Sequence, residues 1–353
     1  MEAGIIDTLE RMQGAGHEQV TYFYDEATGL RAIVAIHSTH LGPALGGCRM
    51  WPYESEAAAL EDVLRLSRGM TYKNAAMGLP LGGGKAVMIG DSRTDKTPEL
   101  FRAFGRAVER LGGRYVTAED VGTEPEDMVA VRSQTEHVVG LPTTSGDPSP
   151  ATAFGVFSGI RAALEHAFGD SDLRGRRVAV QGLGAVGIHL CKYLHEEGAE
   201  LVVTDIAQER MDEAAAAVGA KTVAPGEIYD VECDVFAPCA LGAVVNDGTL
   251  PRFKARIIAG SANNQLAEAR HGEALQARGI LYAPDFIING GGVINVADEL
   301  KPGGYDRTRA YALIARIGEK VARALRLADE LGISSAAAAE MMADERLKGS
   351  AAN

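Results

Sequence analysis

Residues 178–187, which read VAVQGLGAVG, constrain the fold of this chain more than any other segment. They have the pattern of a short apolar strand, a G-x-G-x-x-G turn and the start of a helix. Gly182 permits the tight turn, Gly184 lets the backbone approach a pyrophosphate, and Gly187 lets helix and strand pack closely. The unpaired N–H groups of the helix N-terminus then face the phosphates. The segment predicts a dinucleotide-binding βαβ unit, although such a turn also occurs in ordinary α/β domains.

A second apolar strand, residues 201–205, strengthens this prediction because it ends in Asp205. At this position a carboxylate binds the ribose 2′-hydroxyl of NAD and repels the 2′-phosphate of NADP. No arginine directly follows Asp205 in the sequence. We therefore predict NAD as the cofactor.

The chain divides into two regions with different patterns. From residue 178 onward, expected strands alternate with helices, which is typical of a parallel, doubly wound sheet. The earlier region is mixed α/β and ends in a linker, residues 141–150, that is rich in Pro, Ser and Thr. The tail from about Arg307 to Arg346, rich in Ala, Leu, Arg and Glu, is expected to be helical. The strands expected in the second region are residues 178–181, 201–205, 234–236, 256–260 and 281–288.

Composition excludes several classes of protein. The chain has 353 residues, enough for two domains, and a formal net charge of −13, which disfavours nucleic acid or an anionic membrane as a partner. No apolar run is long enough to span a bilayer, and the acidic N-terminus lacks the features of a signal peptide. The four cysteines fit no metal site and no disulfide framework. We expect a cytoplasmic protein without a metal centre.

Two lysines in the first region are candidates for chemistry. Lys73 and Lys85 stand among small and apolar residues, and three glycines, residues 82–84, precede Lys85. A desolvated lysine near another cation has a lowered pKa and can act as a base. We expect the glycines to leave room for a ligand against the backbone. The alternative is two solvated lysines beside a turn.

Asp120 is the candidate carboxylate of the same region. It lies in the run TAEDVGT, residues 117–123, directly after an expected short strand. It could orient a lysine or relay a proton. The alternative is a turn residue or a helix cap, because Pro125 opens what reads as the next helix.

Two later motifs each follow an expected strand, where ligands bind in sheets of this kind. The first is AGSANNQ, residues 259–265, and the second is NGGGVINV, residues 289–296. Val293 and Val296 are three positions apart and would face the same way on a helix. The alternative for both motifs is a loop with a purely architectural role.

Together these motifs resemble the glutamate/leucine/phenylalanine/valine dehydrogenase family, over nearly the whole chain. The resemblance implies an N-terminal mixed α/β domain, residues 1–147, that binds substrate and forms oligomers. It implies a Rossmann domain, residues 148–325, and a helical segment, residues 326–353, that returns to the first domain. An active-site cleft would lie between the two domains, and the assembly would be a homo-oligomer, a dimer or an octamer. The matching motifs are residues 16–20, 41–50, 69–76, 79–87, 117–123, 260–265, 289–296 and 298–300.

The resemblance also implies a role for individual residues. Lys73 would hold the substrate carboxylate, Lys85 would activate water, and Asp120 would carry protons to and from the amino group. The implied reaction is NAD-dependent oxidative deamination, in which an imine and then a carbinolamine lead to a 2-oxo acid and ammonia. Gly46, Met70 and Asn263 would line the substrate site, and NAD would contact Gly182, Leu183, Gly184, Ala185, Val186, Gly187, Thr152 and Asn263.

The expected side-chain pocket is apolar, with Leu45, Ala118, Val293 and Val296 as its walls. Glutamate-using members of the family carry Lys and Ser at the positions of Leu45 and Val296. Without them a buried substrate carboxylate would be unpaired, at a cost of several kcal/mol on the order-of-magnitude scale for buried charge. Ala118 resembles the leucine-using branch, whereas aromatic-using members tend to have Gly there. We predict leucine, isoleucine and valine as substrates.

Three alternatives remain open at this point. The first is a phenylalanine- or tryptophan-type dehydrogenase, and the second is a dinucleotide-binding protein without catalysis. The third is a hydroxy-acid dehydrogenase, which would use a His–Asp pair that the sequence does not suggest. The chain also departs from common family patterns, with Ala185 in place of Asn, Gly290 in place of Ala, and a short linker.

Overall fold

The computed structural model describes residues 8–349 and divides into two compact units. The first unit comprises Met1–Asp147, Val296–Asp306 and Asp344–Asn353, and the second comprises Pro148–Asn295 and Arg307–Ala343. The tail that we expected to return to the first domain is therefore shared. Its residues up to 343 group with the second unit, and only those after them group with the first.

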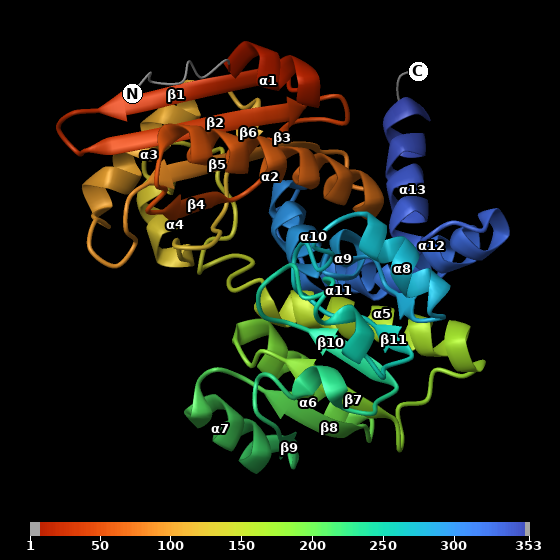
Figure 1. Ribbon diagram of the computed structural model, residues 1–353. Coiled ribbons are helices and arrows are strands. Elements are labelled where there is room, and N and C mark those ends of the chain that lie inside the picture. The colour runs from red at the N-terminus through yellow and green to blue at the C-terminus, as the bar shows by residue number, and fades with distance from the viewer. Residues whose placement is uncertain (1–7, 350–353) are drawn as a thin grey trace, which may run out of the picture. The chain divides into compact units, whose positions relative to one another are not determined.

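A six-stranded sheet forms the centre of the first unit (Figure 1), in the order β1-β2-β5-β3-β6 with β4 paired to β5. β1, β2 and β5 are antiparallel, whereas β3 and β4 run parallel to β5, and β6 runs parallel to β3. The strands are β1 Gln19–Asp25, β2 Leu30–Ser38, β3 Ala44–Leu45, β4 Cys48–Trp51, β5 Gly82–Ile89 and β6 Tyr115–Val116.

The strand β2 is apolar at successive positions rather than at alternate ones, which is typical of a strand that is buried on both faces of a sheet. Ile33 and Ala35 pack with α2 (Glu56–Met77) on one face. Val34 faces the opposite way and packs in the cluster that includes α3 (Pro98–Glu109). The other helices between residues 8 and 147 are α1 Thr8–Ala15 and α4 Pro125–Arg132.

The helix α2 has clear signals at both ends. The Ser55 hydroxyl accepts a hydrogen bond from the backbone N–H of Ala58, which caps the N-terminus. Gly78 ends the helix with φ of 75°, a left-handed conformation that favours glycine. The helix that carries Lys73 is thus defined by local sequence as well as by packing.

A parallel six-stranded sheet forms the second unit, in the order β12-β11-β10-β7-β8-β9. The first strand of this sheet, β7, lies in its middle. The next strands, β8 and β9, lie on one side of β7, and the chain then crosses to β10 on the other side (Figure 1). The predicted doubly wound sheet is confirmed, with its topological switch point between β7 and β10. The strands are β7 Arg177–Gln181, β8 Glu200–Thr204, β9 Lys221–Thr222, β10 Val235–Pro238, β11 Ile257–Ile258 and β12 Leu281–Tyr282.

One predicted strand is wrong over most of its length. Only β12 of the expected strand 281–288 is extended, and Asp285–Ile288 forms the short helix α9. Pro284 lies between them and has no N–H to donate to a neighbouring strand, whereas proline is well suited to the start of a helix. The apolar residues 286–288 have no periodicity that separates a buried strand from a buried helix.

Helices cover the second sheet, and α5 (Ser149–Phe168) packs against α6 (Ala185–Glu196) and α12 (Ile317–Leu331). No helix within residues 8–349 is long and apolar enough to cross a membrane. The helices from α5 onward are α5 Ser149–Phe168, α6 Ala185–Glu196, α7 Gln208–Val218, α8 Arg270–Ala277, α10 Gly291–Ala297, α11 Arg307–Ala315, α12 Ile317–Leu331 and α13 Ser335–Gly349, with short 3₁₀ turns at Ile228–Asp230, Leu250–Arg252 and Asp298–Leu300.

Candidate active site and dinucleotide site

Lys85 and Asp120, both singled out in the sequence, meet in the first unit. Lys85 lies on β5 and is 5% exposed, and its Nζ is 3.0 Å from Oδ2 of Asp120. Asp120 follows β6, which is separated from β5 by β3. The interpretation of Lys85 as a solvated lysine is therefore wrong. It is a buried, paired cation.

One glycine, Gly47, lies in close contact with the segment that carries Asp120. The segment that contains β3 and β4 lies between β5 and the residues that follow β6. The Cys48 N–H at the start of β4 donates to the Ala118 carbonyl at 2.8 Å. A Cβ on Gly47 would lie 2.2 Å from the Glu119 carbonyl oxygen and 2.9 Å from Cβ of Asp120. Any larger residue at Gly47 would push Asp120 away from Lys85.

Arg49 is a second cation at Asp120, and sequence reasoning missed it. Its Nε donates to Oδ2 of Asp120 at 3.0 Å, and its NH1 group donates to Oδ2 of Asp62 on α2 at 2.9 Å. A signal was present in the sequence, because Arg49 stands between the apolar residues Cys48 and Met50, both of which are buried in the structure. An arginine in such a strand needs carboxylate partners.

These two cations control the charge of Asp120. Burial by itself would raise the pKa of Asp120, but the charges of Lys85 and Arg49 outweigh it and hold the pKa below its ordinary value. The backbone of Asp120 also closes a turn with Thr123. The cap of α4 is Glu124 rather than Asp120. Asp120 is thus a turn residue whose side chain is an ionised partner of Lys85.

The pKa of Glu119 is shifted in the opposite direction to that of Asp120. Its burial, together with the charges of Asp147 and Asp120, raises its pKa from 4.5 to about 7. The folded state therefore favours the protonated form, so this contribution to stability is present below pH 4.5 and is lost as the pH rises through about 7.

We expect Glu119→Gln to be more stable relative to the unsubstituted chain at pH 8 than at pH 5. Glutamine keeps the shape of the protonated acid but has no proton to lose. Thermal melts at the two pH values measure the difference in Tm. A constant difference, or one that favours the variant at pH 5, would contradict the assigned perturbation.

Lys73 lies on α2, one turn after Met70 on the same face of the helix. It is partly exposed. Met70 in turn lies against Gly46, because a Cβ on Gly46 would be 3.3 Å from Met70 Cγ. Three predicted substrate-site residues therefore belong to one part of the first unit.

The glycines before Lys85 have a different role from the one expected. A Cβ on Gly83 would lie 2.1 Å from the Thr71 backbone nitrogen, and one on Gly84 would lie 2.7 Å from the Tyr115 ring. One on Gly82 would lie 2.0 Å from the Ser38 carbonyl oxygen. The space beside these glycines is thus filled by the protein itself. They allow α2 and the neighbouring strands to approach β5, and they do not leave room for a ligand.

Three of the four predicted pocket residues lie in the first unit. Leu45 is 1% exposed, Ala118 is 7% exposed and Val296 is 7% exposed. A Cβ on Gly140 would lie 3.7 Å from Val296 Cγ1 and 4.0 Å from Ala118 Cβ, so both flank this glycine. Val293 lies one turn earlier on α10, as predicted, but within the second unit.

In the second unit, the three glycines of the G-x-G-x-x-G turn occupy three different environments. Gly182 has φ of 95°, and its Cβ would lie 2.8 Å from Ala240. A Cβ on Gly187 would lie 2.0 Å from the Gly182 carbonyl oxygen. A Cβ on Gly184 would meet no heavy atom within 4 Å among the described residues. The first two positions therefore require glycine for packing, and the open face at Gly184 fits the approach of a pyrophosphate.

Asp205 is bound to the glycine turn. Its Oδ2 accepts the Leu183 N–H at 2.7 Å and its Oδ1 accepts the Ala207 N–H at 2.9 Å. No arginine adjoins Asp205 in the sequence, but one lies near it in the structure, because NH1 of Arg210 on α7 is 3.7 Å from Oδ1. One helical turn in α7 brings the arginine back to the carboxylate. The neighbouring turn residues Ala185 and Val186 begin α6, whose N-terminus faces this turn.

The two motifs at residues 259–265 and 289–296 contact each other. Nδ2 of Asn289 donates to Oδ1 of Asn263 at 2.8 Å and to the Ser261 carbonyl at 3.1 Å. Sequence reasoning identified Asn263 but assigned no role to Asn289. Thr152, on the first turn of α5, contacts the second motif, because a Cβ on Gly292 would lie 2.7 Å from its Oγ1. Asn263 and Asn289 thus form a polar pair in the second unit, and Thr152 lies beside Gly292 of the second motif.

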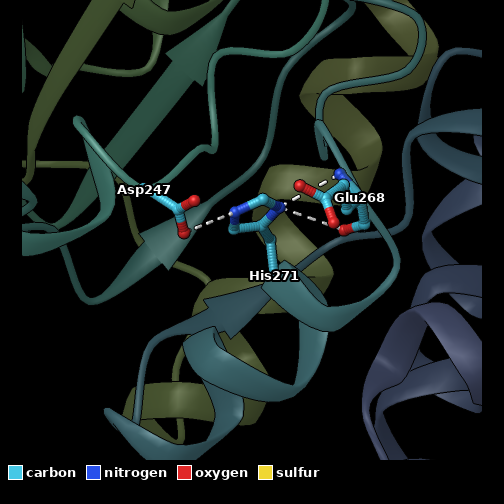
Figure 2. A group of neighbouring side chains, drawn as sticks. All are labelled: Asp247, Glu268 and His271. Carbon is cyan, nitrogen blue, oxygen red and sulfur yellow. Dashed lines mark hydrogen bonds and ion pairs between the residues drawn. The ribbon is translucent and has the colours of Figure 1, made fainter.

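Asp247, Glu268 and His271 form a cluster with the composition of a metal site (Figure 2). The ring of His271 is already engaged, because Nδ1 accepts the Glu268 N–H at 3.0 Å and Nε2 lies 3.3 Å from Asp247. Arg270 pairs with Asp247 at 2.7 Å and with Glu268 at 3.0 Å. The cluster also supplies a His–Asp pair that the sequence did not suggest. Its donors are satisfied by one another, so we interpret it as an attachment of the loop at residue 247 to α8.

Comparison with known proteins gives a consistent result. The family described as Glu/Leu/Phe/Val dehydrogenase, dimerisation domain, matches residues 17–137. The family described as Glutamate/Leucine/Phenylalanine/Valine dehydrogenase matches residues 145–205 and 202–302.

Individual relatives cover almost the whole chain. A leucine dehydrogenase of Thermoactinomyces intermedius is 55% identical over 347 residues, which is 98% of this chain and 93% of that protein. A phenylalanine dehydrogenase of Bacillus thermotolerans is 50% identical over 340 residues, 94% of this chain and 88% of that protein. The crystal structure of L-tryptophan dehydrogenase from Nostoc punctiforme superposes with a TM-score of 0.84 at 44% identity, covering 97% of this chain and 99% of that one.

Proposed function

Since the chain belongs to the glutamate/leucine/phenylalanine/valine dehydrogenase family, we propose that it catalyses the NAD-dependent, reversible oxidative deamination of leucine, isoleucine and valine. The products are the 2-oxo acids and ammonia. The observation that carries this proposal is the buried Lys85–Asp120 pair, with 3.0 Å between Nζ and Oδ2. A dinucleotide-binding protein without catalysis has no need for a buried, paired lysine that carries a desolvation cost.

The residues of the first unit support separate tasks in this reaction. The cation of Lys73 binds the substrate carboxylate, which is the charge that every 2-amino acid shares. Lys85 orients and activates the water that adds to the imine, and Asp120 exchanges protons with the amino nitrogen. The dinucleotide, when bound, supplies the acceptor for the hydride. The open face at Gly184 and the acceptor oxygens of Asp205 support binding of that cofactor in the second unit.

The apolar lining supports an aliphatic substrate. Leu45, Ala118 and Val296 offer no hydrogen bond to a side-chain carboxylate, and all three are buried. The test is an NADH absorbance assay with a panel of 2-amino acids at equal concentration. Turnover of leucine, isoleucine and valine above phenylalanine, tryptophan and glutamate is expected. A preference for phenylalanine or tryptophan would replace this function by the aromatic alternative.

We expect NAD to be used more efficiently than NADP by roughly 10²-fold in kcat/KM, because like-charge contact with a 2′-phosphate costs several kcal/mol. The expected repulsion comes from Asp205. Arg210 opposes it with its positive charge at 3.7 Å. Arg210→Gln should therefore increase the preference for NAD further. Equal efficiency of the two cofactors in the unsubstituted chain would refute the assigned role of Asp205.

The assembly is proposed to be a homo-oligomer, a dimer or an octamer. The match of residues 17–137 to a dimerisation domain supports association of the chain. Light scattering at several concentrations distinguishes the two sizes.

A further inference from the structure

Both cations at Asp120 contact the same oxygen. Nζ of Lys85 and Nε of Arg49 each lie 3.0 Å from Oδ2. For each of these two ion pairs, the closest oxygen of Asp120 is Oδ2 rather than Oδ1. The two carboxylate oxygens are therefore unequal, since both positive charges lie closer to the same one.

Arg49 is itself fixed from the opposite side. Its NH1 group contacts Oδ2 of Asp62 at 2.9 Å, and the Tyr53 hydroxyl donates to the same oxygen at 2.6 Å. The side chains of Arg49 and Asp62 are only 20% and 16% exposed. Asp62 belongs to α2, Arg49 to β4, and Asp120 follows β6. The arginine thus connects three elements through two carboxylates.

The side chain of arginine suits this position because it offers two donors in a rigid, planar arrangement. Nε serves Asp120 and NH1 serves Asp62, so the orientation of one carboxylate is transmitted to the other. A lysine has one flexible ammonium group and cannot fix both oxygens with the same geometry.

We propose that Arg49 is a positioning residue for the deamination, which holds Oδ2 of Asp120 and so makes Oδ1 the oxygen that exchanges a proton with the substrate nitrogen. In this step the N–H bond breaks and its electron pair stays on nitrogen, while an O–H bond forms on Oδ1. The reverse transfer returns the same proton to the leaving amine. The proposal rests on the proposed function of the chain.

The charge of Arg49 has a second consequence for the pH profile. Several groups face Asp120 or its immediate neighbours: Lys85 from β5, Cys48 from β4, Tyr115 from β6, Glu119 from its own segment and Asp127 from α4. The charge of Arg49 lowers the pKa of Asp120, so its loss favours protonation of this carboxylate. The acid limb of kcat/KM should then move to higher pH.

The experiment compares three variants of the full-length chain by the pH dependence of leucine oxidation. Arg49→Gln should lower kcat roughly 10–10²-fold, the scale of misplaced catalytic groups. Its acid limb should move up by about one pH unit, as expected on loss of an adjacent opposite charge. Arg49→Lys should lower kcat but leave the acid limb in place, because it keeps the charge and loses the geometry. Asp62→Asn should do the same, because Arg49 then lacks its anchor.

Arg102→Gln is the matched control, since it removes the same charge from a surface pair with Glu99 on α3. It should leave kcat and the pH profile unchanged. Circular dichroism and NADH binding check the fold of each variant. If Arg49→Gln does not fold, the proposal is tested by the loss of kcat that is expected for Arg49→Lys and Asp62→Asn. Unchanged kcat and acid limb in folded Arg49 variants, or the same shift in the control, would overturn the proposal. An unsubstituted chain that oxidises no amino acid would instead overturn the proposed function, and this role with it.

Discussion

Replacing Lys85 with alanine is expected to reduce kcat for leucine oxidation by roughly 10²–10⁴-fold, the usual contribution of one positioned acid–base group. The reason is the removal of the buried ammonium group that is paired with Asp120 at 3.0 Å. Stopped-flow measurement of NADH formation gives kcat. Binding of NADH, followed by fluorescence, should be retained because the glycine turn lies in the other compact unit.

Lys96→Ala is the appropriate control for this variant. Lys96 is another lysine of the first unit that is paired with a carboxylate, although it is less buried than Lys85, and its Nζ lies 2.6 Å from Asp127. Its removal should cost stability without a comparable loss of turnover. A Lys85→Ala variant within a few-fold of the unsubstituted chain, with intact fold, would exclude Lys85 from catalysis.

Replacing Ala118 with glycine is expected to shift the ratio of kcat/KM from leucine towards phenylalanine. The methyl group of Ala118 is buried and flanks Gly140 together with Val296. Its removal relieves a steric clash with a larger substrate of about 1–3 kcal/mol, the usual cost of overpacking. This corresponds to a change in the ratio of roughly 5–150-fold.

The measurement must compare ratios, because a general loss of activity would report only a damaged fold. Val296→Ala enlarges the same region from the other side and should change the ratio in the same direction. If neither variant changes the ratio, these two side chains do not limit the size of the substrate. If the unsubstituted chain already prefers phenylalanine, the aromatic alternative replaces the branched-chain one.

Local sequence was a reliable guide to the second unit. The strand–turn–helix pattern predicted β7, the glycine turn and α6, because the tight turn and the close packing of strand and helix depend on glycines a few residues apart in the sequence. It failed at residues 281–288, where an apolar run has no periodicity and a proline decides between strand and helix. It also failed for Arg210, whose approach to Asp205 depends on the geometry of one helical turn.

The sequence by itself predicted the parallel sheet and, through its resemblance, the family, and it singled out Lys85 and Asp120 as candidate site residues. These depend on residue type and spacing along the chain, which folding does not change. Only the tertiary structure decided which oxygen of Asp120 is held, that Arg49 and Asp62 belong to the same group, and that residues 82–84 make room for the protein rather than for a ligand. The physical reason is that ion pairs and close backbone contacts join strands and helices far apart in the sequence, so their partners become neighbours only when the sheet has formed.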